Sequence, residues 1–176
     1  MISLYILFWV FLCLFAVIGT IRRWPKELLV IPAVIIALFL ITMLETYLPY
    51  IRDTISVTAR FWFRSAVLVF MTIVGYFIPN FHRVMSRQIF HRDRIDDAIF
   101  GFIIGVLNGY MIIGSIWHFL VEANYPFDWV TAPELVTALG QNTSQLIEIL
   151  PPQWLQGPML YIAAAVSIIL TLVVMI

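Results

Sequence analysis

The amino-acid sequence predicts an all-α protein, a polytopic bundle of about five transmembrane helices with short amphipathic helices at its surface. Three observations support this fold class. The 176 residues are 62% hydrophobic and only 11% charged, which lies far outside the usual balance of soluble domains. The apolar residues gather in long runs that hold few charges. These runs are apolar on all faces and do not alternate as half-buried strands do, so lipid-embedded helices are the structure they favour.

The length of the apolar runs sets the number of predicted spans. A helix needs about 20 apolar residues to cross the hydrocarbon core of a bilayer, which is roughly 30 Å thick. Four runs reach this length, and a fifth is slightly shorter but uncharged. They comprise residues 2–21, 28–48, 61–78, 98–120 and 159–176. Basic residues follow the first run and do not precede it, so we predict a retained helix, not a cleaved signal peptide.

Two of the connections between the apolar runs differ in charge, one being basic and the other acidic. Residues 80–97 carry apolar side chains at helical spacing with arginines largely off that stripe, which indicates a basic amphipathic helix in the headgroup layer or, alternatively, a solvated loop. Residues 121–157 contain acidic residues but no lysine or arginine. We expect one or two short amphipathic helices in this connection, with Pro151 and Pro152 ending the second.

The basic residues also predict the orientation, because positively charged short loops remain in the cytoplasm. Arg22, Arg23 and Lys26 lie in the first loop, and four arginines lie in the third. The second loop also carries arginines, but the fourth carries none. We therefore expect the N-terminus outside the membrane, the C-terminus in the cytoplasm, and residues 121–157 outside.

Several function classes find no support in the sequence. Ten basic and ten acidic residues cancel, so the chain lacks the basic footprint of nucleic-acid binding. A single cysteine, Cys13, cannot form an intrachain disulfide or a Cys/His zinc cluster. Phosphate-binding, dinucleotide-binding, nucleophile-elbow and zinc-protease motifs do not occur. The sequence therefore predicts no catalytic residues, no cofactor and no metal site.

The fourth apolar run carries the most specific pattern. Gly101, Gly105 and Gly109 recur every four residues, so they share one helix face and permit close approach of another helix. That helix belongs either to the same chain or to another subunit. Asn108 lies beside this face near mid-membrane, where an amide needs a partner. It either forms a hydrogen bond across a helix interface or lines a wet cavity.

Charged residues gather at the two ends of the predicted helices. Glu45 and Arg64 should share a depth on the outer side, where they either pair or reach separately to the headgroups. His118 and Glu122 lie one turn apart near the same level, and we expect them to reach to the surface instead of forming a metal site. At the cytoplasmic end, Asp96 and Asp97 should lie level with Arg22 and Arg23. Either Asp97 pairs with Arg22 across the helix ends, or the carboxylates act only on the dipole of their own helix.

Two segments resemble motifs of the colicin V production (CvpA) family of bacterial inner-membrane proteins. The first, Gly19-x-x-Arg22-Arg23-x-x-Lys26-Glu27, resembles the family's G-x-x-R-G-x-x-[KR]-E. The second, Asp97-Ala98-x-x-Gly101-x-x-x-Gly105-x-x-Asn108-Gly109, is similar to its D-R-x-x-G-x-x-x-G-x-x-R-G. The charged residues that match are Arg22, Lys26, Glu27 and Asp97. Arg23, Ala98 and Asn108 depart from the pattern, so no role is carried over to them.

The resemblance implies a domain organisation and a function. Residues 1–120 would form the family's membrane module, residues 121–157 an extracytoplasmic connection, and residues 158–176 an additional C-terminal helix. The implied role is a non-enzymatic accessory or scaffold protein of the bacterial inner membrane, linked to toxin production or export and to envelope homeostasis. The resemblance brings no catalytic residues with it.

Two other functions are compatible with the residues. The apolar helices and the glycine face suit a small structural subunit of a larger membrane complex. Asn108 and the outer charges suit a transporter or channel component, although this function needs a continuous polar path. The expected partners are the lipid bilayer and, through the glycine face, either a second copy of the chain or a larger complex.

Overall fold

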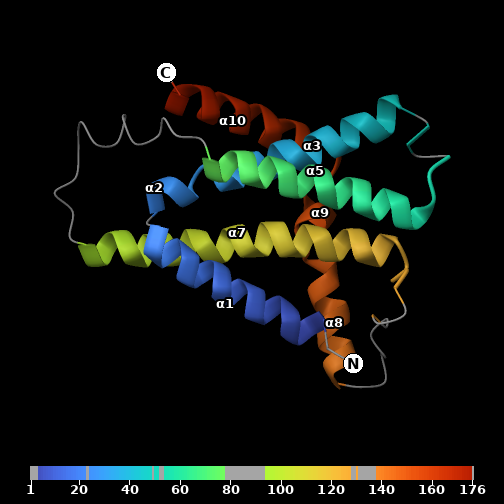
Figure 1. Ribbon diagram of the computed structural model, residues 1–176, viewed down its shortest axis with the longest axis horizontal. Helices are drawn as coiled ribbons and strands as arrows, with labels where there is room; N and C mark the ends of the chain where they lie inside the picture. The colour runs from blue at the N-terminus through green and yellow to red at the C-terminus, as the bar shows by residue number, and fades with distance from the viewer. Residues whose placement is uncertain are drawn as a thin grey trace.

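The computed structural model describes residues 4–22, 24–48, 50–51, 54–77, 94–127, 130 and 138–175, and over these residues it contains helices but no strand. The helices lie close to the predicted apolar runs (Figure 1). They are α1 (Leu4–Arg22), α2 (Trp24–Glu27), α3 (Val30–Tyr47), α5 (Val57–Phe77), α7 (Arg94–Glu122), α8 (Ala138–Glu148), α9 (Pro151–Trp154) and α10 (Gly157–Met175). The all-α class is confirmed for this part of the chain.

Among the described residues, four helices are long and apolar enough to cross a membrane, judged by length and composition. They are α1, α3, α5 and residues Asp96–Glu122 of α7. The apolar part of α10 with described side chains, Gly157–Val173, is shorter than these four. The structure thus has four candidate spans where about five were expected. Residues 80–93 of the predicted basic amphipathic helix lie outside the described residues, and α7 begins at Arg94.

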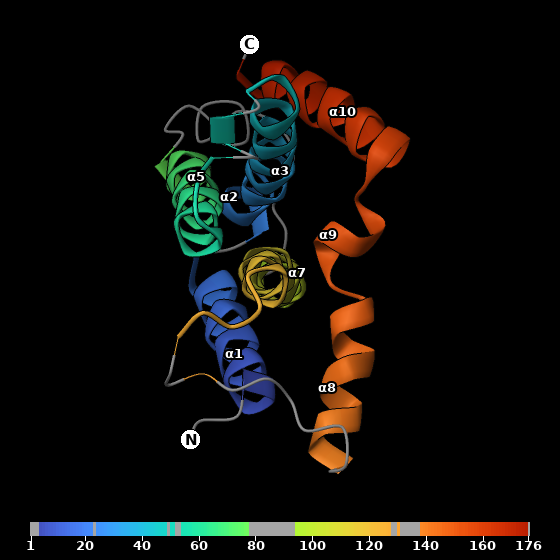
Figure 2. The ribbon, with the colours of Figure 1, turned by 90° about the vertical axis from the view of Figure 1, so that its right-hand side faces the viewer.

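The four long helices alternate in direction. The end of α1, the start of α3, the end of α5 and the start of α7 lie together, and we call this the Asp97 end of the bundle (Figure 1). The opposite end, where α7 finishes, is the Glu122 end. Figure 2 shows α7 end-on, with α1 on one side of it, α3 and α5 on another, and α8 to α10 along a third. Because α7 contacts helices on several sides, it is the central element of the bundle.

The apolar core follows this arrangement. Val34 of α3 and Leu68 of α5 are fully buried and belong to a cluster that includes Met111 and Ile112 of α7. A second cluster joins Phe8 of α1 to α7 and to Leu150, which lies between α8 and α9. Outward-facing side chains on the long helices are largely apolar, as expected for helices that contact lipid.

The connection between α7 and α10 contains one feature beyond the prediction. Helix α8 ends at Glu148, just before Pro151 and Pro152, and the two prolines also begin α9, since they occupy its first turn after an extended Leu150. Proline has no backbone N–H and a fixed φ, and both properties suit the first turn of a helix. The chain then turns so that α10 begins alongside the second half of α3, with the rings of Phe39 and Tyr161 5.9 Å apart. As a result α10 starts part-way along α3 and not beyond its end.

Candidate functional site

Within the described ranges of the chain, charged side chains and their polar partners form two groups in the bundle, one toward each end. The Glu27 cluster consists of Arg22, Glu27, Tyr76 and Asn108. The Arg64 cluster consists of Glu45, Arg64, His118 and Glu122. Buried polar groups are costly unless they are paired, so these clusters are the first places to look for function.

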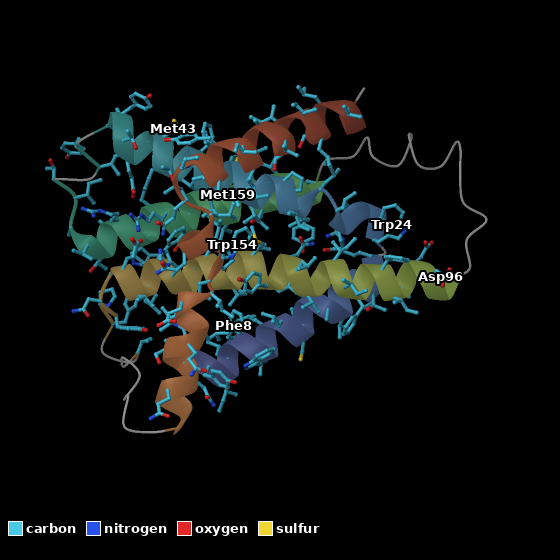
Figure 3. The ribbon with its side chains drawn as sticks, turned by 180° about the vertical axis from the view of Figure 1, so that it is seen from behind. Phe8, Trp24, Met43, Asp96, Trp154 and Met159 are labelled. Atoms are coloured by element: carbon cyan, nitrogen blue, oxygen red, sulfur yellow. The ribbon has the colours of Figure 1, made fainter. Side chains whose placement is uncertain are left out.

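The short helix α2 positions Glu27. It follows α1 after a single intervening residue, and the indole N–H of Trp24 donates a hydrogen bond of 3.1 Å to Oδ1 of Asp97. Figure 3 shows Trp24 and Asp96 at the same end of the bundle. This bond ties α2 to the start of α7, and Glu27, at the end of α2, is completely buried.

Three other helices supply partners to the Glu27 carboxylate. The Asn108 amide of α7 donates to Glu27 Oε2 at 2.7 Å and to the Glu27 carbonyl at 3.1 Å. The Tyr76 hydroxyl of α5 donates to Oε2 at 3.3 Å, and Arg22 Nε of α1 lies 3.3 Å from Oε1. These partners lower the cost of burying a carboxylate, so the cluster joins α1, α2, α5 and α7.

Arg22 connects two members of this cluster. Besides Glu27, it donates a 3.2 Å hydrogen bond to the carbonyl of Tyr76, and its guanidinium lies 4.4 Å from the centre of the Tyr76 ring. The partners that the structure gives these two residues differ from the predicted pair of Arg22 with Asp97: Arg22 contacts Glu27, and Asp97 accepts a hydrogen bond from the Trp24 indole. The side chain of Lys26 lies outside the described residues.

The Arg64 cluster is built from α3, α5 and α7. Arg64 binds Glu45 through two hydrogen bonds, Nε to Oε1 at 2.6 Å and Nη2 to Oε2 at 2.8 Å, and it also pairs with the Glu122 carboxylate through Nη1. The guanidinium lies 5.5 Å from the centre of the Phe119 ring. The planar fork of arginine suits this two-bond geometry. Arg64 of α5 thus links α3, which carries Glu45, to α7, which carries Glu122.

His118 is the least expected member of this cluster. Its exposed fraction is only 6%, so the prediction that it reaches to the surface is wrong. Its Nε2 lies 3.7 Å from Glu122 Oε2, and its buried Nδ1 has no hydrogen-bond partner among the described residues. The cause is tertiary, since the α9 to α10 segment folds back beside α7 and covers this side chain.

Two cavities adjoin the Arg64 cluster. One, of about 170 Å³, lies between α3, α7 and the start of α10 and includes Glu45, His118 and Gly157 in its lining. The other, of about 190 Å³, lies between α5 and α7 and includes Arg60 and Ala123. Both are lined by Arg64 and Glu122, so this ion pair borders the two spaces. In the described part of the chain, no group of three or more His, Cys, Asp or Glu side chains could hold a metal ion.

The glycine face of α7 packs against α1 of the same chain. A Cβ added to Gly105 would meet the carbonyl oxygen of Phe15 and would lie 3.1 Å from Cα of Gly19. A Cβ added to Gly19 would meet the carbonyl oxygen of Gly101 and lie 2.8 Å from Cα of Gly105. At Gly109 it would meet the Phe15 side chain at 2.9 Å. The two backbones approach so closely only because Gly19, which the spacing argument did not single out, faces the stripe.

Gly114, a further glycine of α7, allows α9 to pack closely against this helix. A Cβ on Gly114 would lie 2.7 Å from Cδ of Pro151, and the Tyr110 hydroxyl donates to the carbonyl of Ile149. The Trp154 indole in turn donates to that hydroxyl at 3.2 Å. In the sequence, the only feature that indicates this contact is Gly114 itself, which follows Gly109 after five residues and so does not continue the spacing of Gly101, Gly105 and Gly109.

No family model, curated protein or solved structure matches this chain. The resemblance to the CvpA family therefore stays a prediction that depends on the two motif segments. In the structure these segments lie against each other, through Gly19 with Gly101 and Gly105 and through Glu27 with Asn108.

Proposed function

We propose that this chain is a non-enzymatic accessory or scaffold protein of the CvpA type in the bacterial inner membrane. One observation carries the proposal. The described buried charges pair with other side chains to join helices, and they do so in one cluster toward each end of the bundle. Such pairing holds helices in a defined register and suits a rigid membrane-embedded platform.

The region between the clusters supports a scaffold over a transporter. Asn108 and His118 are ten residues apart on α7, which corresponds to about 15 Å along a helix. Met111 and Ile112 lie between them on α7, and Val34 and Leu68 pack there from α3 and α5. The buried hydroxyl of Ser115 in this layer donates to the carbonyl of Met111 on its own helix. Conduction would require polar groups across this layer.

The contact between the two motif segments supports the link to the CvpA family. Arg22 and Glu27 of the first segment pair with each other, and Trp24 between them contacts Asp97 of the second. Sequence elements about 70 to 80 positions apart thus form one structural unit, as expected if the motifs act together. On this basis we propose a role in toxin production or export and in envelope homeostasis.

The proposal includes an orientation. The first loop of the chain is basic, so the Asp97 end would face the cytoplasm and the Glu122 end the exterior or periplasm. The N-terminus would then lie outside, and α10 would end on the cytoplasmic side. The Arg64 cluster and its cavities would face the outer leaflet.

A flux measurement tests the scaffold role. Purified protein reconstituted in proteoliposomes should carry no proton, sodium or potassium flux above that of empty vesicles, and Asn108→Ala should behave in the same way. An Asn108-dependent flux would replace the scaffold by a transporter. Native mass spectrometry of the protein purified from its source membrane addresses the remaining alternative, because stoichiometric large subunits would make it a component of a larger complex.

A further inference from the structure

The cavity between α3, α7 and α10 combines a charged side with an apolar side, and we call it the His118 cavity. Glu45, Arg64, His118 and Glu122 line the charged side. Leu38 and Leu160 line the apolar side. At about 170 Å³ it is smaller than the roughly 300–1,000 Å³ typical of sites for drug-sized ligands, so it would hold a small headgroup.

The charges in this lining favour a cation. Two carboxylates face one guanidinium, so the Arg64 cluster carries one net negative charge when His118 is neutral. Three of the five N–H groups of Arg64 already point at Glu45 and Glu122. Arg64 therefore has only two N–H groups left that could bind an anion. The Glu122 side chain, in contrast, remains 47% exposed.

The hydrogen-bonding groups favour a ligand that donates. The Glu122 carboxylate lines the cavity and is half exposed, so its oxygens remain accessible acceptors beside the pair with Arg64. The Thr42 hydroxyl donates its hydrogen to the carbonyl of Leu38 at 2.9 Å, so its oxygen is an acceptor as well.

We propose that the His118 cavity binds a primary ammonium group. Such a group has one positive charge and three N–H donors, which suit the net negative charge of the cluster and the acceptor oxygens of Glu122 and Thr42. Its carbon chain would lie against Leu38 and Leu160. The group comes either from the ethanolamine headgroup of a membrane lipid or from a free amine. This site goes beyond the scaffold role, which needs no ligand.

The experiment compares two lipids that differ in their N–H donors. The full chain is placed in phosphatidylglycerol nanodiscs with added phosphatidylethanolamine or phosphatidylcholine, and the lipid retained is measured by native mass spectrometry. Retention of phosphatidylethanolamine should exceed that of phosphatidylcholine about tenfold, the effect of one charge-assisted hydrogen bond. Free ethanolamine that displaces the lipid would indicate a soluble amine as a sufficient ligand, whereas failure to displace it would assign the site to lipid.

Two variants locate the site. Glu122→Gln removes the half-exposed carboxylate charge and should lower phosphatidylethanolamine retention about tenfold. Glu148→Gln, an exposed position on α8 outside the cavity, makes the same chemical change and should leave retention unaltered. Equal retention of the two lipids by the parent protein would overturn the proposal without any variant. Unchanged discrimination in a folded Glu122→Gln protein would overturn the assignment to this cavity. Neither result would affect the scaffold role.

Discussion

At the scale of single residues, Glu27 depends most on its surroundings because its side chain is entirely buried. Its carboxylate has Asn108, Tyr76 and Arg22 as partners, from three different helices. Asn108 is equally buried, and its amide donates once to this carboxylate and once to the backbone carbonyl of Glu27. The amide and the carboxylate are therefore expected to be energetically coupled, since removal of either one takes a buried hydrogen bond from the other.

A double-mutant cycle tests this coupling. Asn108→Leu should lower the free energy of unfolding by about 1–3 kcal/mol, because a buried carboxylate loses its main donor. Glu27→Leu should also destabilise the protein, but the double variant should be more stable than the sum of the two effects predicts, by about 0.5–3 kcal/mol. Thermal unfolding in detergent measures all four proteins.

A distant pair provides the control for this cycle. Glu148 lies exposed on α8, so Asn108→Leu combined with Glu148→Gln should be additive to within about 0.5 kcal/mol. Additivity between Asn108 and Glu27 as well would contradict the direct hydrogen bond between them.

At the scale of elements, the contact between α1 and α7 has the closest backbone approach described for the long helices. It depends on Gly19 and Gly105, whose missing side chains let the backbones meet, with Gly19 facing the carbonyl oxygen of Gly101. Between helices in lipid, association depends on such van der Waals contact, because lipid chains are as apolar as the side chains they would replace. This crossing should therefore be sensitive to added volume.

Gly105→Leu tests the crossing. Its new Cβ would meet the carbonyl oxygen of Phe15, which belongs to the backbone and cannot swing aside. We expect a loss of about 1–3 kcal/mol in the free energy of unfolding, typical of overpacking, seen as a lower melting temperature in detergent. Ile103→Leu is the matched control, because Ile103 is 50% exposed on another face of α7. If Gly105→Leu melted like the parent, the crossing would not hold the bundle together.

The second feature at this scale is the packing of α9, and of the end of α8 before it, against α7. This packing depends on Gly114, which admits Pro151, and on Tyr110, whose hydroxyl bonds to Ile149 and Trp154. Tyr110→Phe removes these bonds while it keeps the ring, and each such bond contributes about 0.5–1.5 kcal/mol. Hydrogen–deuterium exchange should then become faster in α8 and α9 and stay unchanged in α3. The exposed Tyr50 supplies a control, since Tyr50→Phe should alter neither region. Unchanged exchange in Tyr110→Phe would mean that packing at Gly114 alone holds α9.

At the scale of the whole molecule, the position of the bundle in the membrane follows from its two ends. The long helices alternate in direction, so each end has a single predicted side (Figure 1). In the proposed orientation, the basic first loop would place the Asp97 end in the cytoplasm. Gln141 and Gln153 are exposed on α8 and α9, and both belong to the connection expected outside.

Cysteine labelling tests this orientation. The native Cys13 is first replaced by alanine, and single cysteines are introduced at Gln141, Gln153 or Gln88. A membrane-impermeant maleimide added to intact cells should label the first two positions, whereas Gln88 should react only after the membrane is opened. Labelling of Gln88 from the exterior would invert the orientation. It would also place the His118 cavity toward the inner leaflet.

Much of the architecture was predictable from the sequence, because it depends on local properties of the chain. The length and apolarity of the runs predicted α1, α3, α5 and α7, since a residue's preference for lipid does not depend on its neighbours in space. The four-residue spacing of Gly101, Gly105 and Gly109 likewise predicted a face for close contact, because helical geometry alone brings them together.

The tertiary structure decided which groups meet, since pairing depends on the depth and neighbours that each helix finally has. Gly19 faces Gly105 because of where α1 crosses α7, and Glu27 reaches Asn108 because α2 folds back against α7. The same reason explains what the sequence did not predict. Helix α9 begins at Pro151 where Gly114 leaves room for the proline ring, and His118 is buried in a region where residues of α9 and α10 pack beside α7. Local patterns encode each helix, but contacts between distant helices are set by packing of the whole chain.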